Sequence, residues 1–268
     1  MGAPAPFFMQ IEMELNHKVL GEGFPVIILH GLFGMLDNWQ SVAKKIAAEG
    51  FMVYLIDQRD HGKSPFTDRF DYPTLAQDLA TFMEQNWIYK AHLIGHSMGG
   101  KTVMQFAFDH GDMVEKMVVV DICNRAYVGG HEEILEAIRM VDAENRQDRQ
   151  EIYDFLKDRL KNEGVVQFLL KNLQRKKEGG YEWKMNIALL EQSYPHILEK
   201  VNSSHPIFEG PGLFIKGEYS SYIQDEDLAA IQTEFPNSAI ETIDGAGHWV
   251  HADQPELFTQ KVIQFLSK

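Results

Sequence analysis

Residues 95–102 read Gly-His-Ser-Met-Gly-Gly-Lys-Thr, a pattern that fits two different kinds of chemistry. As G-x-S-x-G centred on Ser97, they predict a nucleophile elbow, a strained strand-to-helix turn that exposes a serine hydroxyl for covalent catalysis. As G-x-x-x-x-G-K-T ending at Thr102, they predict a P-loop, in which backbone amides and Lys101 would bind phosphates. The flanking residues fit both interpretations, because each motif needs an apolar strand before it and a helix after it.

The next strand also has two interpretations. Residues 117–120 are apolar and lead directly into Asp121. This carboxylate could be the acid of a catalytic triad, or it could bind the magnesium ion of a nucleotide hydrolase. The choice between the two chemistries therefore depends on more distant parts of the chain.

A serine hydrolase also needs two amide donors for the oxyanion and a histidine base. Residues 26–29 form an apolar run that leads into His30 and the loop Gly-Leu-Phe-Gly, so the amide of Leu32 can join that of Met98 as an oxyanion donor. Residues 243–249 end in Gly-His-Trp, which places His248 on a tight loop near the C-terminus, where the base is expected.

Three neighbours of these residues have predicted supporting roles. We expect His30 to bond to the backbone of the oxyanion loop rather than to act as a base. Phe33 and Trp249 flank the predicted catalytic residues, and we expect both to line the substrate pocket.

His248 and His251 are three residues apart, but no third ligand of suitable spacing accompanies them, so no metal site is predicted.

Four motifs occur in an order that resembles the α/β-hydrolase fold superfamily, and bacterial YbfF-type esterases within it. They are H-G-L-F-G at residues 30–34, D-Q-R-D-H-G-K-S at 57–64, G-H-S-M-G-G-K at 95–101 and V-V-D-I at 119–122. The resemblance covers nearly the whole chain. It implies a serine nucleophile at Ser97 and favours the hydrolase over the P-loop nucleotide hydrolase.

The acid departs from the commonest pattern of the superfamily. Many members carry an aspartate three residues after the glycine that ends the penultimate strand, and that position is Ser220 here. In YbfF-type esterases the acid follows the strand after the elbow helix, which implies Asp121, with Ser220 as a second hydrogen-bond partner. The rival acids are Glu218, Asp225, Asp227 and Asp244.

Short β-branched runs alternate with helical patterns, which predicts an α/β fold with a mostly parallel, doubly wound sheet. We expect strands at residues 8–15, 17–20, 26–29, 52–56, 92–94, 117–120, 213–217 and 239–243. Amphipathic helices alone are expected over residues 124–206, at 132–142, 149–161, 165–173 and 186–201. The prediction is a core domain of residues 1–123 and 207–268, with a helical cap of residues 124–206 inserted after the sixth strand.

The cap is expected to cover the active site with an apolar face. The candidate lining residues are Phe155, Leu156, Phe168, Leu169, Trp183 and Tyr194. The basic run Arg175-Lys-Lys177 could contact the phosphates of an acyl-CoA thioester, although a solvated loop is the simpler explanation. We expect residues 57–64 to hold a loop together through side-chain to backbone hydrogen bonds.

Composition narrows the range of partners. The chain has 268 residues, 25 Lys and Arg, 39 Asp and Glu, and a formal net charge of −14, which disfavours nucleic acid. The single cysteine, Cys123, is expected to be a buried apolar residue. No signal peptide or membrane helix is predicted, so we expect a cytoplasmic protein.

These patterns together predict a cofactor-independent carboxylic ester hydrolase that uses an acyl-enzyme and acts on a small ester with a short to medium acyl chain. The close alternative is a thioesterase with the same triad. The oligomeric state cannot be derived from the sequence.

Overall fold

A twisted seven-stranded sheet forms the centre of the molecule. The computed structural model describes residues 13–268. The strand order is β1-β3-β2-β4-β5-β8-β9; β1 is antiparallel to β3 and every other neighbouring pair is parallel. The strands are β1 (His17–Leu20), β2 (Phe24–Leu29), β3 (Phe51–Ile56), β4 (Ala91–His96), β5 (Val114–Val120), β8 (Gly212–Gly217) and β9 (Ser238–Ile243).

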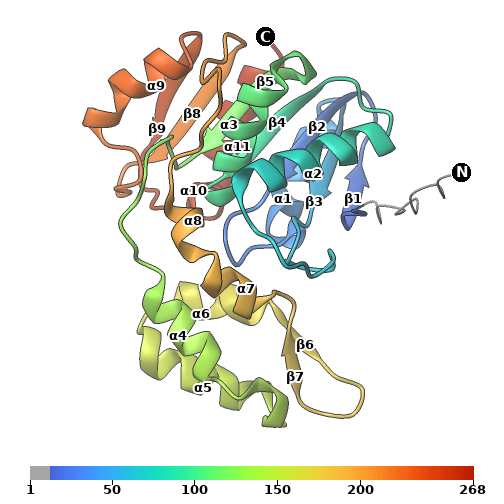
Figure 1. Cartoon of the computed structure of the whole chain (residues 1–268), viewed down its shortest axis with the longest axis vertical. Helices are drawn as coiled ribbons and strands as arrows, with labels where there is room; N and C mark the ends of the chain where they lie inside the picture. The colour runs from blue at the N-terminus through green and yellow to red at the C-terminus, as the bar shows by residue number, and fades with distance from the viewer. Residues whose placement is uncertain (1–12) are drawn as a thin grey trace, which may run out of the picture.

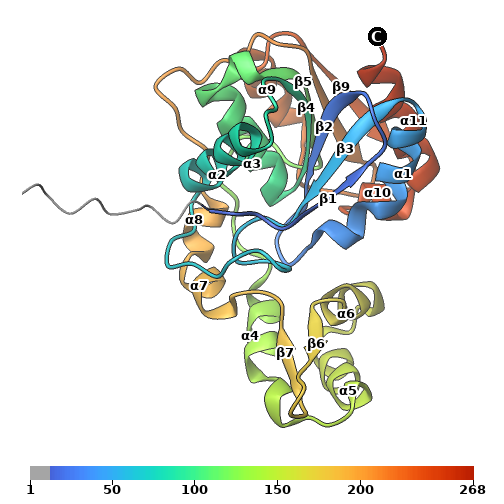
Figure 2. The same ribbon diagram turned by 90° about the vertical axis from the view of Figure 1, so that its right-hand side faces the viewer.

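Helices cover both faces of the sheet, as a parallel sheet requires because both of its faces are apolar. Figure 2 shows α2, α3 and α9 on one face, and α1 and α11 on the other. The central strands β2, β4 and β5 have runs of buried residues that form one apolar core with each layer of helices. The helices are α1 (Gln40–Ala48), α2 (Tyr72–Gln85), α3 (Met98–Asp109), α9 (Leu228–Glu234), α10 (Val250–Asp253) and α11 (Pro255–Leu266).

The segment between β5 and β8 forms a separate group of elements at one end of the sheet, drawn in the lower half of Figure 1. Its helices α7 and α8 lie nearest the core, and the hairpin β6–β7 projects away from it. The elements are α4 (Glu132–Met140), α5 (Arg149–Leu160), α6 (Glu163–Leu170), β6 (Leu173–Arg175), β7 (Tyr181–Trp183), α7 (Ile187–Gln192) and α8 (Tyr194–Leu198).

The structure also contains short 3-10 turns. They are η1 (Leu36–Trp39), η2 (Gly111–Met113), η3 (Ala143–Asn145) and η4 (Asp225–Asp227). The turns η1 and η4 directly precede α1 and α9. Among the described helices, none is both long and apolar enough to cross a membrane.

Three sequence predictions about the fold need correction. Residues 13–15 are not part of a strand, and residues 8–12 lie outside the described part of the chain, so the insertion follows the fifth described strand. The insertion also contains the hairpin β6–β7, where only helices were expected. The predicted helix of residues 186–201 is two short helices, because Ser193 and Pro195 start a new helix at Tyr194.

Candidate active site

All the predicted catalytic residues lie at the carboxyl edge of the sheet. Ser97 directly follows β4, Asp121 directly follows β5, and the His248 loop follows β9. The loop that contains Leu32 follows β2, and Ser220 lies shortly after β8. Since parallel strands end at the same edge, residues far apart in the sequence meet there.

Ser97 has the backbone conformation of a nucleophile elbow. Its φ of 52° and ψ of −118° lie in a region that a side chain adopts only under strain. The turn is possible because the backbones pack closely: a Cβ on Gly95 would stand 2.2 Å from the carbonyl oxygen of Gly99, and one on Gly99 would stand 2.5 Å from that of Leu29. The glycines of the motif are therefore a steric requirement of the turn.

Lys101 is not available to a phosphate, as the P-loop interpretation would require. It is buried, and its Nζ donates to the carbonyl oxygens of Arg125 at 3.0 Å and Leu198 at 3.3 Å, and to that of Glu199. Arg125 precedes the first inserted helix, Leu198 ends the last one and Glu199 follows it, so Lys101 ties both ends of the insertion to α3.

Asp121 is the carboxylate that the structure brings to the imidazole of His248. The distance from His248 Nδ1 to Asp121 Oδ2 is 2.7 Å, and the carboxylate is fully buried. Ser220 Oγ donates to the same oxygen, and the amide of Gly217 donates to Oδ1 at 2.9 Å. These bonds fix the carboxylate and leave one of its oxygens directed at the imidazole.

The rival acids have other partners or lie elsewhere. Asp227 forms an ion pair with Arg125 at 3.1 Å, and Glu218 accepts from the amide of Gly245 at 2.7 Å. Asp225 is solvent-exposed beside Lys216. Among the described residues, the carboxylate bonded to the imidazole of His248 is that of Asp121, not that of Asp244.

Two rings hold the imidazole of His248 in place. Tyr222 stacks on it with ring centroids 3.9 Å apart and planes 17° apart. His96 lies 4.7 Å away between ring centroids, and its Nε2 donates to the backbone carbonyl oxygen of His248 at 2.9 Å. Sequence reasoning missed both residues, although Tyr222 lies two positions after Ser220 and His96 is the variable residue of the elbow motif.

Two histidines, His30 and His61, form hydrogen bonds to the backbone of the loop that contains Leu32. The amide of Gln58 donates to His30 Nε2 at 3.1 Å, so His30 Nδ1 carries the proton and donates to the carbonyl oxygen of Gly31 at 2.9 Å. Similarly, the amide of Phe33 donates to His61 Nε2 at 3.3 Å. Burial lowers the pKa of His30 to about 4, which keeps the ring neutral.

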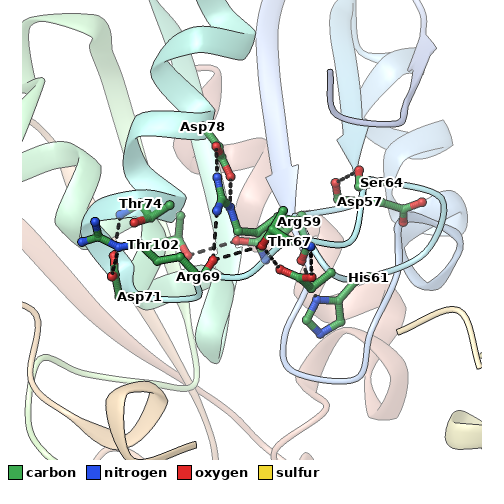
Figure 3. Close-up of polar contacts among 12 residues, drawn as sticks. Asp57, Arg59, His61, Ser64, Thr67, Arg69, Asp71, Thr74, Asp78 and Thr102 are labelled. Carbon is green, nitrogen blue, oxygen red and sulfur yellow. Dashed lines mark hydrogen bonds and ion pairs between the residues drawn. The ribbon is translucent and has the colours of Figure 1, made fainter. Parts of the chain in front are cut away.

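Residues 57–64 form the loop that contains Gln58 and His61. Figure 3 shows Arg59 facing Asp78 in a two-pronged ion pair, with nitrogen–oxygen distances of 2.5 and 2.7 Å. Asp57 accepts from the amide of Leu36 at 2.7 Å, and the hydroxyl of Ser64 donates to the Asp57 carbonyl oxygen at 2.5 Å. The loop is knitted together as expected, and in addition it anchors the residues that follow β2.

Two chambers meet at Ser97. The smaller chamber has a volume of about 40 Å³. It is lined by His248 and by Phe33 and Trp249, the two predicted pocket residues. The larger, of about 370 Å³, is lined by Met98 and Tyr222 and falls within the usual size range of ligand pockets. Their combined linings therefore contain the predicted nucleophile, the base and both oxyanion residues.

The cap contributes fewer of the predicted lining residues than expected. Phe168 and Leu169 line the smaller chamber, and Tyr194 contacts a residue of its wall through its hydroxyl. Phe155, Leu156 and Trp183 line neither chamber. Residues 175–177 lie in the hairpin β6–β7 and also line neither chamber, so they do not support a phosphate contact next to Ser97.

Other predictions concern metals and the cysteine. Within the described residues, no group of three or more His, Cys, Asp or Glu side chains is arranged to hold a metal ion. His251, one of the two histidines considered as a metal pair, stacks on Trp39 with ring centroids 4.0 Å apart. Cys123 is buried, and desolvation raises the pKa of its thiol to about 11, which makes it a poor nucleophile.

Comparison with known proteins gives the family of the chain. The family described as alpha/beta hydrolase fold matches residues 25–255. The chain belongs to the α/β-hydrolase fold family. The hydrolase is 37% identical to esterase YbfF of Escherichia coli, over 91% of this chain and 93% of that protein.

Two further relatives agree with this family. This α/β-hydrolase is 38% identical to the sn-1-specific diacylglycerol lipase ABHD11 of Danio rerio, over 92% of this chain and 79% of that protein. The solved structure of a marine microorganism esterase superposes with a TM-score of 0.92 and 42% identity, covering 94% of this chain and 99% of that one.

Proposed function

We propose that this α/β-hydrolase is a carboxylic ester hydrolase that acts through a Ser97–His248–Asp121 triad and an acyl-enzyme. The observation that carries the proposal is the bond of 2.7 Å between His248 Nδ1 and the buried Asp121 Oδ2. His248 lines a chamber that Ser97, in its strained elbow, also lines. The similarity to esterases and lipases supports ester substrates. The larger chamber, at about 370 Å³, supports a short to medium acyl chain.

In the proposed mechanism, Ser97 Oγ attacks the ester carbonyl carbon while His248 Nε2 accepts the hydroxyl proton. The carbonyl oxygen becomes negatively charged, and the amides of Leu32 and Met98 donate to it. Among the described residues, the amide of Leu32 has no acceptor, so it is free for this role. A donor of this kind contributes roughly 10²–10³ in kcat.

The tetrahedral intermediate then collapses. The bond from carbon to the alkoxy oxygen breaks, and His248 returns the proton to the leaving alcohol. A water molecule next attacks the acyl-enzyme with His248 as base, which releases the carboxylic acid and restores the hydroxyl of Ser97. Asp121 keeps the Nδ1 proton of His248 in place and stabilises the imidazolium in both halves of the reaction.

Labelling with a fluorophosphonate, followed by peptide mass spectrometry, tests the nucleophile. We expect one adduct on Ser97, loss of esterase activity in proportion to labelling, and neither adduct nor activity in Ser97→Ala. Ser221→Ala is a matched control, because Ser221 lines the larger chamber but is outside the proposed triad. An unlabelled Ser97 in an active enzyme would contradict the proposal.

A further inference from the structure

Only three residues, among those described, line both chambers: Ser97, Leu32 and His131. In the proposed reaction, the two halves of the ester diverge from the carbonyl carbon that Ser97 attacks. One chamber on each side of Ser97 can receive one half, which would place the scissile bond at their junction. Ser97 and Leu32 come from the core and already have proposed roles there. His131 comes from the insertion, as the N-cap residue of α4.

Tyr194 holds His131 in one orientation. The amide of His131 donates to the hydroxyl oxygen of Tyr194 at 3.0 Å, and the same oxygen lies 3.0 Å from His131 Nδ1. Burial raises the pKa of Tyr194 to about 12, so the hydroxyl keeps its proton. In the described part of the chain, His131 Nδ1 is the acceptor that lies within hydrogen-bonding distance of this hydroxyl, which favours the tautomer in which Nδ1 accepts.

The proton of the imidazole therefore resides on Nε2. Burial lowers the pKa of His131 to about 4, so the ring is neutral and carries a single N–H. With Nδ1 accepting from Tyr194, that N–H is on Nε2. Within the described residues Nε2 has no hydrogen-bond partner, and the ring packs edge-on against Phe33 with centroids 6.0 Å apart. A neutral imidazole whose Nε2 is unpaired among the described residues thus lines both chambers beside Ser97.

We propose that His131 is a specificity-determining residue whose Nε2–H donates a hydrogen bond to the alkoxy oxygen of the bound ester. This proposal rests on the proposed ester hydrolase function. The carbonyl oxygen is already bound by the amides of Leu32 and Met98, which leaves the alkoxy oxygen as the remaining acceptor of the scissile group. That oxygen becomes more negative as its bond to carbon breaks, so the hydrogen bond strengthens in the transition state.

This geometry selects oxygen esters over thioesters. Sulfur is a weak hydrogen-bond acceptor, so a thioester with the same acyl and alkyl groups gains little from the Nε2–H of His131. The insertion thereby decides between the two substrate classes that the triad alone would accept. The basic residues 175–177, in contrast, lie in the β6–β7 hairpin and line neither chamber.

The experiment compares kcat/KM for ethyl hexanoate and S-ethyl hexanethioate, which differ only in the atom bonded to the acyl carbon. His131→Phe keeps a ring and removes the donor, and His131→Gln keeps an N–H. We expect His131→Phe to lower kcat/KM for the oxygen ester about three- to tenfold, with less than a twofold change for the thioester. His131→Gln should restore part of the oxygen-ester rate.

Tyr194→Phe removes the hydroxyl that sets the tautomer of His131. Like His131→Phe, it should lower the ratio of kcat/KM for the oxygen ester to kcat/KM for the thioester. His196→Phe is the matched control, because His196 is an exposed histidine on α8 of the same insertion. It should leave the ratio unchanged.

An equal loss with both substrates, or no loss with either, would overturn the proposal for His131. Failure of the proposed function gives a different result: the wild-type chain would hydrolyse neither substrate and Ser97 would stay unlabelled. If His131→Phe does not fold, the ratios of His131→Gln and Tyr194→Phe still decide, since each keeps the size of the side chain close to that of the wild type.

Discussion

The carboxylate of Asp121 is held in one orientation by its hydrogen bonds. Three donors, from His248, Ser220 and Gly217, converge on its two oxygens in a fully buried position. A buried carboxylate is tolerated only when it is bonded in this way, because an unpaired charge is costly to desolvate. Its φ of 51° is also unusual for a residue with a side chain, and the strain positions the carboxylate beside β8.

Asp121→Asn tests the role of this carboxylate. The amide cannot stabilise the imidazolium, and its NH₂ group favours the wrong tautomer of His248, so we expect kcat to fall about 10⁴-fold with a small change in KM. Ser220→Ala removes one donor and keeps the charge, so its loss in kcat should be about tenfold. Steady-state kinetics on one ester measures both; near-normal turnover of Asp121→Asn would rule out Asp121 as the acid.

At the scale of elements, the site depends on how the insertion is attached. The connections on either side of it, residues 124–131 and 199–206, meet at the buried ammonium of Lys101, and the amide of Tyr127 also donates to the carbonyl oxygen of Leu198 at 2.8 Å. Tyr72 of α2 adds a bond of 2.7 Å from its hydroxyl to the carbonyl oxygen of Ile197. The elbow helix therefore positions both the nucleophile and the helices that cover it.

Lys101→Met should loosen this attachment. Three carbonyls lose their donor, so we expect a KM several-fold higher and faster limited proteolysis within residues 124–131 and 199–206. Lys116→Met is the matched control, because Lys116 also donates to two backbone carbonyls, those of Phe265 and Leu266, far from the insertion. Equal protease sensitivity of the two variants would argue against a specific tie at Lys101.

Across the described part of the molecule, six histidines are neutral because they are buried. Burial lowers the pKa of each below the ordinary value of 6.5. The unfolded chain therefore binds more protons than the folded chain between about pH 6.5 and pH 4, and stability falls as the pH falls through that window. The residues are His30, His61, His92, His96, His131 and His251.

His92 allows a test away from the active site. It lies on β4 between Phe24 and Phe51, and burial lowers its pKa to about 4. In His92→Leu, the slope of unfolding free energy against pH between about 6.5 and 4 should decrease by about one proton, measured by urea titration at several pH values. His205→Leu, at an exposed position, is the control; an unchanged slope in His92→Leu would contradict the prediction.

The sequence by itself was enough for the family, the α/β architecture and the proposed nucleophile, base and oxyanion residues. The family rested on a resemblance carried by four motifs. The architecture and the elbow depend on short-range rules: glycines permit the close approach at the elbow, and apolar periodicity marks the strands and helices. The same rules suggested Asp121 only together with a family resemblance, and left four other carboxylates open.

Only the tertiary structure decided which side chains meet. Asp121 and His248 are 127 residues apart, and the order of β5, β8 and β9 in the sheet sets their contact. Tyr222, which stacks on the imidazole, and His131, which lines both chambers, have no local sequence signal. Their positions depend on how a loop and the insertion pack against the core. The P-loop interpretation fails for the same reason, since the carbonyls that bind Lys101 come from segments distant in the sequence.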